Sequence, residues 1–464
     1  MSSRLRSSKV RHVYADLPKD KETYSNFTLD STMGDHNFIN AGLKHFALSV
    51  KGGGGQVLVI SHGNYGKVNQ NGAPPIINGH KSAVLDTAFS PFNGDILATG
   101  STDCSICIWQ IPEGGVKENM TDPAIRLAKH HKKVIFLEFH PTSSNVLASA
   151  SADKTIRLWD IETGQIGSEF KNHKDLIQSM LWNEDGSLMF TTCKDKHARF
   201  FDPRTNEVVA KFSAHESVKA AKGVFMTSMN KFVTVGATKQ AKRELKVWDI
   251  RKMSETKQLK RITLDSAAGT MMPFYDRANK LLFVGGKGDG SMRIFEMAED
   301  KNMIYECSQF STGEEPCKGL TALPKASCDV MKCETMRILK LSSQRVSELK
   351  FVIPRKSDDF QEDLFPDDYA GIPAQTAADY FAGQNAAPVL MSLNPEERTD
   401  VQAQSFSAKP SAGGSKGPVK AANVVNADGK STTDLEKELK AAQAKIKSLE
   451  AEVKSLEKKL ASFN

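Results

Sequence analysis

Hydrophobic and polar positions repeat along the middle of the chain in one order: an apolar strand, small residues before an aspartate, then a strand that ends in an aromatic residue. Three copies align closely, at residues 97–110, 147–160 and 189–202. Their aspartates, Asp103, Asp153 and Asp195, lie 50 and 42 residues apart. A period of 40 to 50 residues with two or more strands in each unit is typical of the blades of a β-propeller.

Histidines upstream of each aspartate strengthen this interpretation. They occur as Gly79-His80-Lys81, His131-Lys132, His173-Lys174 and Ala214-His215-Glu216, which are landmarks of WD repeats. Weaker copies follow at 231–250 and 280–297, a degenerate copy at 325–341, and an early pair of strands around a glycine turn at 45–61. Together these units predict an all-β protein whose bulk is a seven-bladed WD-repeat β-propeller.

The repeated polar residues have a structural explanation. In each blade the histidine, a serine or threonine, the hairpin aspartate and the final tryptophan can satisfy one another's buried polar groups. The predicted networks are His80, Ser101, Asp103 and Trp109 in the second blade, and His131, Ser151, Asp153 and Trp159 in the third. His130 is placed equally well for the third blade. The fourth blade carries Phe201 in place of tryptophan, so it should depend more on packing.

The C-terminal part of the chain follows different patterns. Residues 395–433 are rich in Ala, Ser, Gly, Lys, Pro and Asn and are predicted to be a disordered linker. From residue 434 to 464 apolar residues recur with 4-3 spacing, which predicts an α-helical coiled coil and self-association. The predicted oligomerisation residues are Leu435, Leu439, Ile446, Leu449, Glu450, Val453, Leu456 and Leu460.

Composition narrows the class of protein. The chain has 464 residues, 25% of them charged, and a net charge of +7. It contains no apolar run long enough for a transmembrane segment, and the basic N-terminus, residues 1–12, has no apolar stretch behind it to form a signal peptide. Seven cysteines with irregular spacing favour reduced thiols. We therefore expect a cytosolic protein.

Candidate catalytic and cofactor motifs have simpler explanations. Cys104 and Cys107 are three residues apart on a predicted strand, so their side chains should point to opposite faces. The glycines from Gly285 to Gly290 lack the order of a phosphate-binding loop and join two strands. We expect no enzyme activity, cofactor or metal, and no nucleic-acid binding, because the sequence has no basic motif interleaved with aromatic residues.

Lysines gather in the turns that the propeller should place on one face. The His-bearing loops and the Asp-bearing hairpins open on the same side of the ring, and they contain Lys81, Lys132, Lys133, Lys154, Lys174, Lys194, Lys196 and Lys287. One interpretation is a basic face suited to an acidic protein partner. The other, equally open, is that lysine is simply a common residue of solvated turns.

Several segments outside the general repeat are similar to the short coronins, which are actin-binding WD-repeat proteins. They are RSSKVRHVY (6–14), GHKSAVLDTAFSPFN (79–93), IPEGG (111–115), CKDKHARFFDPRTN (193–206), MPFYDRANKLLFVGGKGDGSMR (272–293) and IPRKSDDFQEDLFPD (353–367). The expected layout is then a basic arm (1–12), the propeller (13–340), a C-terminal extension packed on the lower face of the propeller (341–394), the linker (395–433) and the coiled coil (434–464).

The resemblance also implies a function. It implies a protein of the actin-rich cell cortex that binds and bundles actin filaments (F-actin), acts in motility, phagocytosis and endocytosis, and cooperates with the actin-nucleating complex and with filament-severing factors. It slightly favours a trimeric coiled coil over a dimer or tetramer, although Lys445 stands where such coils usually have arginine. The alternative function is a WD-repeat adaptor for a signalling or ubiquitin-transfer client.

One departure from the family affects the choice of site residues. Thr28 occupies the place where animal coronins carry an arginine used in filament binding, so that contact does not transfer. Filament binding would depend on other basic side chains. The candidates are Arg6, Lys9, Arg11, Lys81, Lys194, Lys196, Lys242 and Arg243.

Overall fold

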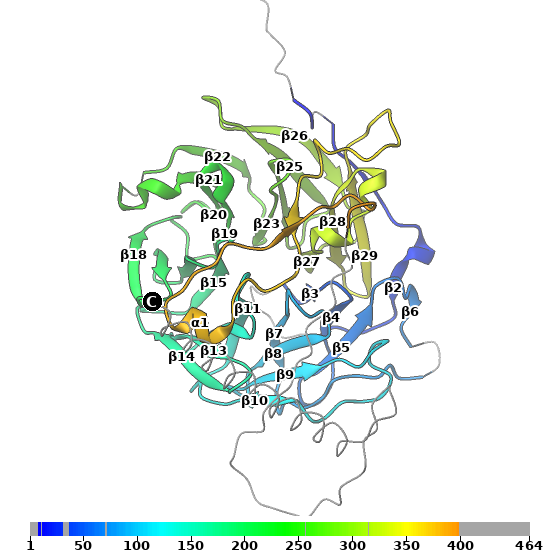
Figure 1. Cartoon of the computed structure of the whole chain (residues 1–464), viewed down its shortest axis with the longest axis vertical. Helices are drawn as coiled ribbons and strands as arrows, with labels where there is room; N and C mark the ends of the chain where they lie inside the picture. The colour runs from blue at the N-terminus through cyan, green and yellow to red at the C-terminus, as the bar shows by residue number, and fades with distance from the viewer. Residues whose placement is uncertain are drawn as a thin grey trace, which may run out of the picture. The chain divides into compact units, whose positions relative to one another are not determined.

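The computed structural model describes residues 8–10, 12–30, 37–69, 72–255, 257–313 and 315–398. Within these residues, seven sheets stand around a common axis, each sheet being one blade (Figure 1). Their strand pairs are antiparallel except for β2 with β6 in blade seven. The predicted seven-bladed β-propeller is therefore confirmed. The predicted linker (395–433) from residue 399 on, and the predicted coiled coil, lie outside the described residues.

The first four blades follow the chain in order. Blade one contains β3 (Ile39–Ala41), β4 (His45–Val50) and β5 (Gln56–Ser61). Blade two contains β7 (Val84–Phe89), β8 (Ile96–Ser101), β9 (Ile106–Gln110) and β10 (Ile125–Leu127). Blade three contains β11 (Val134–Phe139), β12 (Val146–Ser151), β13 (Ile156–Asp160) and β14 (Gln165–Phe170). Blade four contains β15 (Ile177–Trp182), β16 (Met189–Cys193), β17 (Ala198–Asp202) and β18 (Glu207–Phe212).

The remaining blades complete the ring. Blade five contains β19 (Lys222–Met226), β20 (Lys231–Ala237), β21 (Arg243–Asp249) and β22 (Lys260–Asp265). Blade six contains β23 (Met271–Asp276), β24 (Leu281–Gly286), β25 (Ser291–Met297) and β26 (Ile304–Ser311). Blade seven contains β27 (Gly319–Ala322), β28 (Glu334–Leu341) and β29 (Arg345–Val352), joined by β1 (Tyr14–Asp16), β2 (Thr23–Ser25) and β6 (Gly66–Lys67). Short 3₁₀ turns lie at Asp20–Glu22, Thr227–Met229, Ile250–Glu255, Lys325–Ser327 and Val330–Lys332.

Blade seven joins the two ends of the propeller. Strand β29 pairs antiparallel with β28 on one side and with the N-terminal strands β1 and β2 on the other. The expected boundary between propeller and extension at residues 340 and 341 therefore cuts through this blade and is wrong. The reason is that β29 completes a sheet whose other members come from both ends of the propeller, which no internal repeat reveals.

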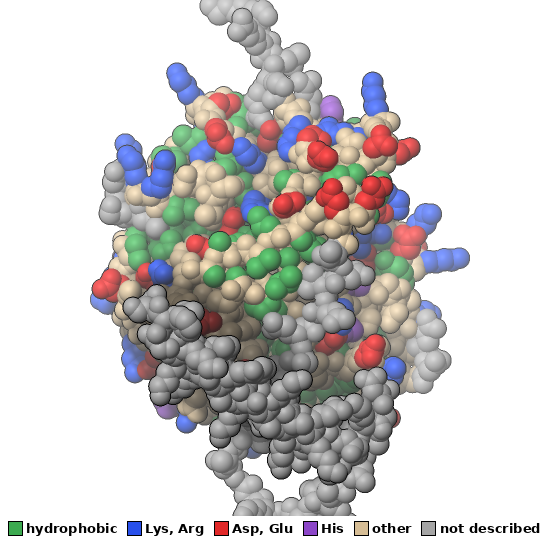
Figure 2. Space-filling model, viewed as in Figure 1, with side chains coloured by type: hydrophobic (Ala, Val, Ile, Leu, Met, Phe, Trp, Pro, Cys, Tyr) green, Lys and Arg blue, Asp and Glu red, His purple; other side chains and the backbone are tan. Residues whose placement is uncertain are grey.

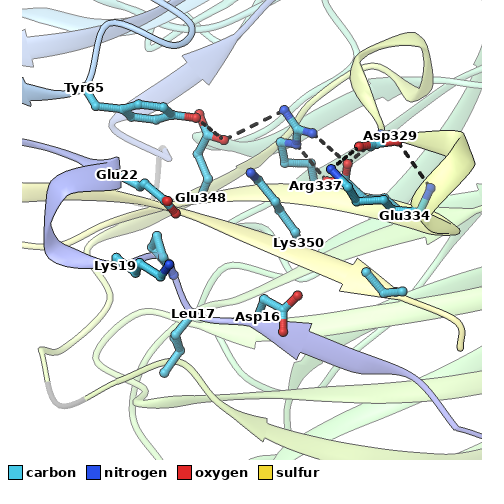
Figure 3. A pocket seen from close by; sticks show the side chains of 13 residues that line it. Asp16, Leu17, Lys19, Glu22, Tyr65, Asp329, Glu334, Arg337, Glu348 and Lys350 are labelled. Atoms are coloured by element: carbon cyan, nitrogen blue, oxygen red, sulfur yellow. Dashed lines mark hydrogen bonds and ion pairs between the residues drawn. The ribbon is translucent and has the colours of Figure 1, made fainter.

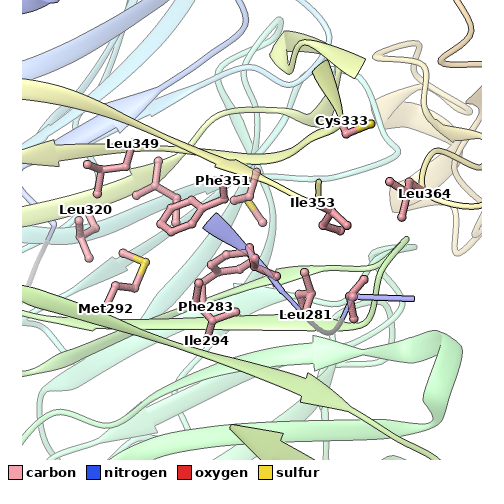
Figure 4. Close-up of a cluster of buried hydrophobic side chains, with 14 of the residues drawn as sticks. Leu281, Phe283, Met292, Ile294, Leu320, Cys333, Leu349, Phe351, Ile353 and Leu364 are labelled. Atoms are coloured by element: carbon pink, nitrogen blue, oxygen red, sulfur yellow. The ribbon is translucent and has the colours of Figure 1, made fainter. Parts of the chain in front are cut away.

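Apolar side chains fill the spaces between neighbouring blades. Between blades six and seven, Phe283 of β24 and Phe351 of β29 face one another with ring centroids 4.8 Å apart. Leu281, Ile294 and Leu349 are fully buried in the same cluster (Figure 4). Each blade thus buries both faces of its sheet against its neighbours, which is how a propeller builds a continuous core from small units.

The segment after β29 crosses one face of the propeller (Figure 1, yellow to orange). It contains a short pair of strands, β30 (Asp368–Tyr369) and β31 (Leu390–Met391), and one helical turn, α1 (Ala377–Phe381), whose N-terminus is capped by Thr376 and Asp379. Tyr380 of α1 is buried with its ring 4.4 Å from that of His140. We call this side the extension face. The opposite side, which carries the hairpins between the second and third strands of the blades, is the lysine face.

Candidate functional site

Hydrogen bonds in blade two hold the base of the lysine face. His80 Nδ1 lies 3.1 Å from the Asp103 carboxylate, and His80 Nε2 lies 2.8 Å from the Thr99 hydroxyl. Trp109 Nε1 donates to the same Thr99 oxygen over 2.9 Å. The predicted role of Ser101 is therefore wrong, because its hydroxyl donates to the Ser82 carbonyl over 2.9 Å. Positions two apart on a strand share a face, so the sequence could not choose between these two hydroxyls.

Blade three repeats the arrangement and shows a second correction. His130, rather than His131, lies 2.9 Å from Asp153 and 2.8 Å from Ser149, and Trp159 donates to Ser149 over 2.8 Å. His131 contributes only its backbone N–H to Asp153. As in blade two, the linking hydroxyl is two residues earlier than expected. The prediction of Ser151 as this hydroxyl is wrong, because the Ser151 hydroxyl donates to the Lys132 carbonyl over 3.0 Å.

These contacts fix the charge of the hairpin aspartates. Burial by itself would raise the pKa of Asp103, but hydrogen bonds from His80, Ser105 and the Lys81 backbone N–H outweigh it and hold the pKa well below its usual range. The histidines stay neutral where burial dominates, as it does for His130, whose pKa is lowered. The side chains of these networks have a structural role. The exposed lysines in the adjacent turns are therefore the candidates for contact with a partner.

Blades four and five depart from the pattern. In blade four Asp195 pairs with Arg199, while His173 keeps its bond to Thr191 at 2.9 Å. In blade five His215 lies 2.9 Å from Glu244, a residue of strand β21 that sequence reasoning missed. The available signal was a glutamate inside the strand that carries Trp248.

Four predicted site residues gather on the lysine face. Lys81, Lys194, Lys196 and Lys242 are all exposed, as are Lys132, Lys133 and Lys174 in neighbouring turns. Among the residues that the structure describes, no carboxylate lies within ion-pair distance of the ammonium groups of Lys81, Lys194, Lys196 or Lys242. A row of charges without such partners on one surface can attract an acidic partner.

Two other predicted site residues are elsewhere. Lys9 donates to the backbone carbonyl of Asp363, in the segment that crosses the extension face. Lys9 is therefore not part of the lysine face. Arg243 is buried, and its guanidinium donates to both oxygens of Asp265, at 2.6 and 2.7 Å, and to Asp289 at 2.7 Å. Its guanidinium thus links blades five and six. The sequence could not reveal this role, because a strand pattern does not show which side chains bridge two blades.

Some predicted residues lie outside the described part of the chain. These are Arg6 and Arg11 of the N-terminal arm and the oligomerisation set Leu435, Leu439, Ile446, Leu449, Glu450, Val453, Leu456 and Leu460.

A polar pocket of about 420 Å³ lies beside blade seven, where the N-terminal segment leaves the sheet between β1 and β2 (Figure 3). Two ion pairs lie in its wall: Arg337 with Glu334 at 2.6 Å, and Lys332 with Asp329 at 2.8 Å. Within the described residues, no group of His, Cys, Asp and Glu side chains is arranged to hold a metal ion. Residues of the N-terminal segment and of β28 and β29 meet at this pocket, where the ring closes.

Comparison with known proteins decides the family. The chain is 45% identical over 394 residues to coronin-A of Dictyostelium discoideum, which covers 85% of this chain and 87% of that protein. The chain belongs to the coronin family. The WD40 domain of Toxoplasma gondii coronin, a solved structure, matches with a TM-score of 0.77 and 30% identity over 83% of this chain and 98% of that one. The predicted resemblance is thus confirmed.

Family models agree with the blade assignment of this coronin-family chain. The WD domain, G-beta repeat, matches residues 74–110, 123–160 and 164–202, which contain the strands from β7 to β17. A further type of WD40 repeat matches residues 346–388, and a domain of unknown function matches residues 3–67. A chain from the mitotic checkpoint complex, at 12% identity and a TM-score of 0.53, shares the fold alone. No helix in the described ranges is long and apolar enough to span a membrane.

Proposed function

We propose that this coronin-family protein binds actin filaments through its lysine face and bundles them through coiled-coil oligomerisation. The observation that carries the proposal is the group of exposed lysines Lys81, Lys194, Lys196 and Lys242 on the face opposite the extension. An actin filament has an acidic surface, so these side chains supply complementary charge. Family membership supplies the choice of actin among acidic partners.

The oligomer supplies strength that one propeller lacks. A contact made mainly by exposed lysines is weak and screened by salt. Linking several propellers converts later binding events into intramolecular ones, which raises avidity by orders of magnitude without new contacts. A homo-oligomer, with a trimer slightly preferred, would also hold two filaments at once, and the protein would then act at the cytoskeleton of the cell cortex in motility, phagocytosis and endocytosis.

Two further partners belong to the same proposal. We place the actin-nucleating complex and filament-severing factors among the proteins with which this chain cooperates, because the family resemblance implies them. No catalytic step or cofactor is needed for any of these roles.

Co-sedimentation with actin filaments tests the lysine face. The double variant Lys194→Glu/Lys242→Glu should bind roughly tenfold more weakly at low salt, because two contacts become repulsive. The control Lys21→Glu/Lys211→Glu makes the same change of charge at exposed positions on the outer rim and should bind like the unmodified chain. Equal losses in both variants would show that net charge, and not this face, attracts the filament.

Removal of residues 434–464 tests the oligomer. The truncated chain should still pellet with filaments at low salt but should no longer bundle them in low-speed sedimentation. If the full chain itself fails to pellet at low salt, actin is not the partner, and an adaptor role for another acidic client replaces this proposal.

A further inference from the structure

An apolar cavity of about 530 Å³ opens on the extension face, between the propeller and the segment that crosses it. Its walls include Phe92, Pro273, Phe274, Pro324 and Val389. The cations in the wall are already neutralised, since Arg277 pairs with Asp368 at 2.9 Å and Lys325 with Asp276 at 3.1 Å. The cavity therefore suits an uncharged apolar group.

The rim of the cavity also exposes apolar side chains. Tyr369, Ile372 and Val389, which line it, are 39%, 38% and 37% exposed, and Leu390, next to Val389 in the chain, is 45% exposed. Figure 2 shows hydrophobic side chains running as a band across this face. A contiguous apolar patch around a hollow is typical of a surface that another segment covers.

Acidic residues lie along the segment that crosses this face. Asp358, Asp359, Glu362 and Asp367 are exposed on the crossing segment, and Glu396 is exposed at its end. Figure 2 shows acidic side chains gathered along one side of the same face. A segment that fits here should carry an apolar side chain followed by basic ones.

The chain itself supplies such a segment at the right place. Arg398, the last described residue, donates to the backbone carbonyl of Ala326 over 3.3 Å, and Ala326 lines the cavity. The sequence then continues as VQAQSFSAKP at 401–410, in which Phe406 is the one aromatic residue between 399 and 462 and Lys409 follows it. Eight residues of extended chain span up to about 26 Å, so Phe406 can reach the cavity.

We propose that residues 401–410 of this chain dock on the extension face, with the Phe406 ring in the apolar cavity and Lys409 near the acidic residues of the crossing segment. The docking is intramolecular, so the short tether supplies an effective concentration in the millimolar range and a modest affinity is enough. The segment is thereby part of the folded unit instead of the linker, and the free linker begins near residue 411.

Photo-cross-linking in the full chain tests the proposal. Benzoyl-phenylalanine at position 406 should cross-link to peptides that contain Phe274, Pro324 or Val389, whereas the same probe at Val424 should not. Oligomers assembled from a mixture of isotopically light and heavy chains distinguish cross-links within one chain from cross-links between two chains. Cross-links within one chain support the proposal, and cross-links only between chains, or none in the cavity, overturn it.

A pair of variants gives an independent measurement. Val389→Glu places a charge at a partly exposed position on the rim and should reduce the yield of the 406 cross-link at least fivefold. Val208→Glu, at a position that is also 37% exposed but lies on strand β18, should leave the yield unchanged. A loss in both variants, or in neither, contradicts the assignment of the cavity. Filament pelleting is a separate readout, so failure here leaves the proposed function standing.

Discussion

Nδ1 of His215 lies 2.9 Å from Oε1 of Glu244, and both side chains are almost fully buried. His215 Nε2 lies 2.9 Å from the Thr234 hydroxyl, to which Trp248 also donates. Blade five thus keeps the histidine, hydroxyl and tryptophan of the WD network but takes its carboxylate from the strand instead of the hairpin. Glu244 also pairs with Lys246 at 3.1 Å and Arg261 at 2.6 Å.

Glu244→Gln should destabilise the propeller by about 2 to 4 kcal/mol, because the amide leaves Lys246 and His215 without a buried negative partner. Urea unfolding at pH 7, followed by tryptophan fluorescence, measures the change. Glu216→Gln is the matched control, since Glu216 is exposed and should have no measurable effect. An equal and small effect of both variants would contradict the structural role of Glu244.

The same residue predicts an acid transition. Burial opposes ionisation of Glu244, but hydrogen bonds from His215 and Lys246 prevail and lower its pKa to about 2. A carboxyl whose folded pKa is depressed contributes stability above its unfolded pKa, and that contribution is lost as the pH falls towards the folded value. The unmodified chain should therefore lose more unfolding free energy between pH 4.5 and pH 2 than Glu244→Gln does.

Arg243→Lys should lower stability by about 1 to 3 kcal/mol, because an ammonium cannot make the fork that joins Asp265 to Asp289. Thermal unfolding measures the loss. Arg251→Lys is the control, since that guanidinium is exposed and pairs only with Asp249 at 2.8 Å within the described residues. Filament binding by folded Arg243→Lys should be unchanged, and a specific loss of binding at full stability would restore Arg243 as a contact residue.

Asp86→Asn should stabilise the protein at pH 8 by about 1 to 2 kcal/mol. Asp86 lies on β7 and accepts a hydrogen bond from the Leu137 backbone N–H of β11 over 2.8 Å, but burial prevails and raises its pKa to about 7. An acid with a raised folded pKa loses stability as the pH rises from its unfolded value, near 3.8, to the folded value.

The asparagine keeps the acceptor for Leu137 and removes the charge. The difference between Asp86→Asn and the unmodified chain should accordingly shrink as the pH is lowered from 8 to 4. Unfolding free energies across this range measure it, with Asp122→Asn at an exposed site as the control. A difference that does not change with pH would mean that Asp86 is ionised in the fold throughout.

Tyr380→Ala should release the segment that crosses the extension face. The Tyr380 ring is 1% exposed and lies 4.4 Å from His140 and 6.4 Å from Trp182 between ring centroids. Loss of this buried aromatic contact should raise the rate of proteolytic cleavage between residues 383 and 389 roughly tenfold or more. Tyr380→Phe retains the ring and should be cleaved at the rate of the unmodified chain, so faster cleavage of both variants would point to the hydroxyl instead of the packing.

The sequence alone determined the repeating unit of this protein. Strands β4 and β5 around the glycine turn, the hairpin aspartates Asp103 and Asp153 and the terminal tryptophans were all visible, because alternation, turn residues and period are local properties of the chain. The seven-bladed ring followed from counting these units. The basic turns were visible too, since their position within each unit places them on one face.

Only the tertiary structure decided which side chain meets which. The choice of Thr99 over Ser101, and of His130 over His131, depends on the depth of a strand in the blade and on the path of a turn. Arg243 became a bridge because Asp265 at the end of β22 and Asp289 in the hairpin between β24 and β25 both approach it. Strand β29 joined the propeller because N-terminal strands pair with it. These contacts join residues distant in sequence, so their geometry exists only once the ring has closed.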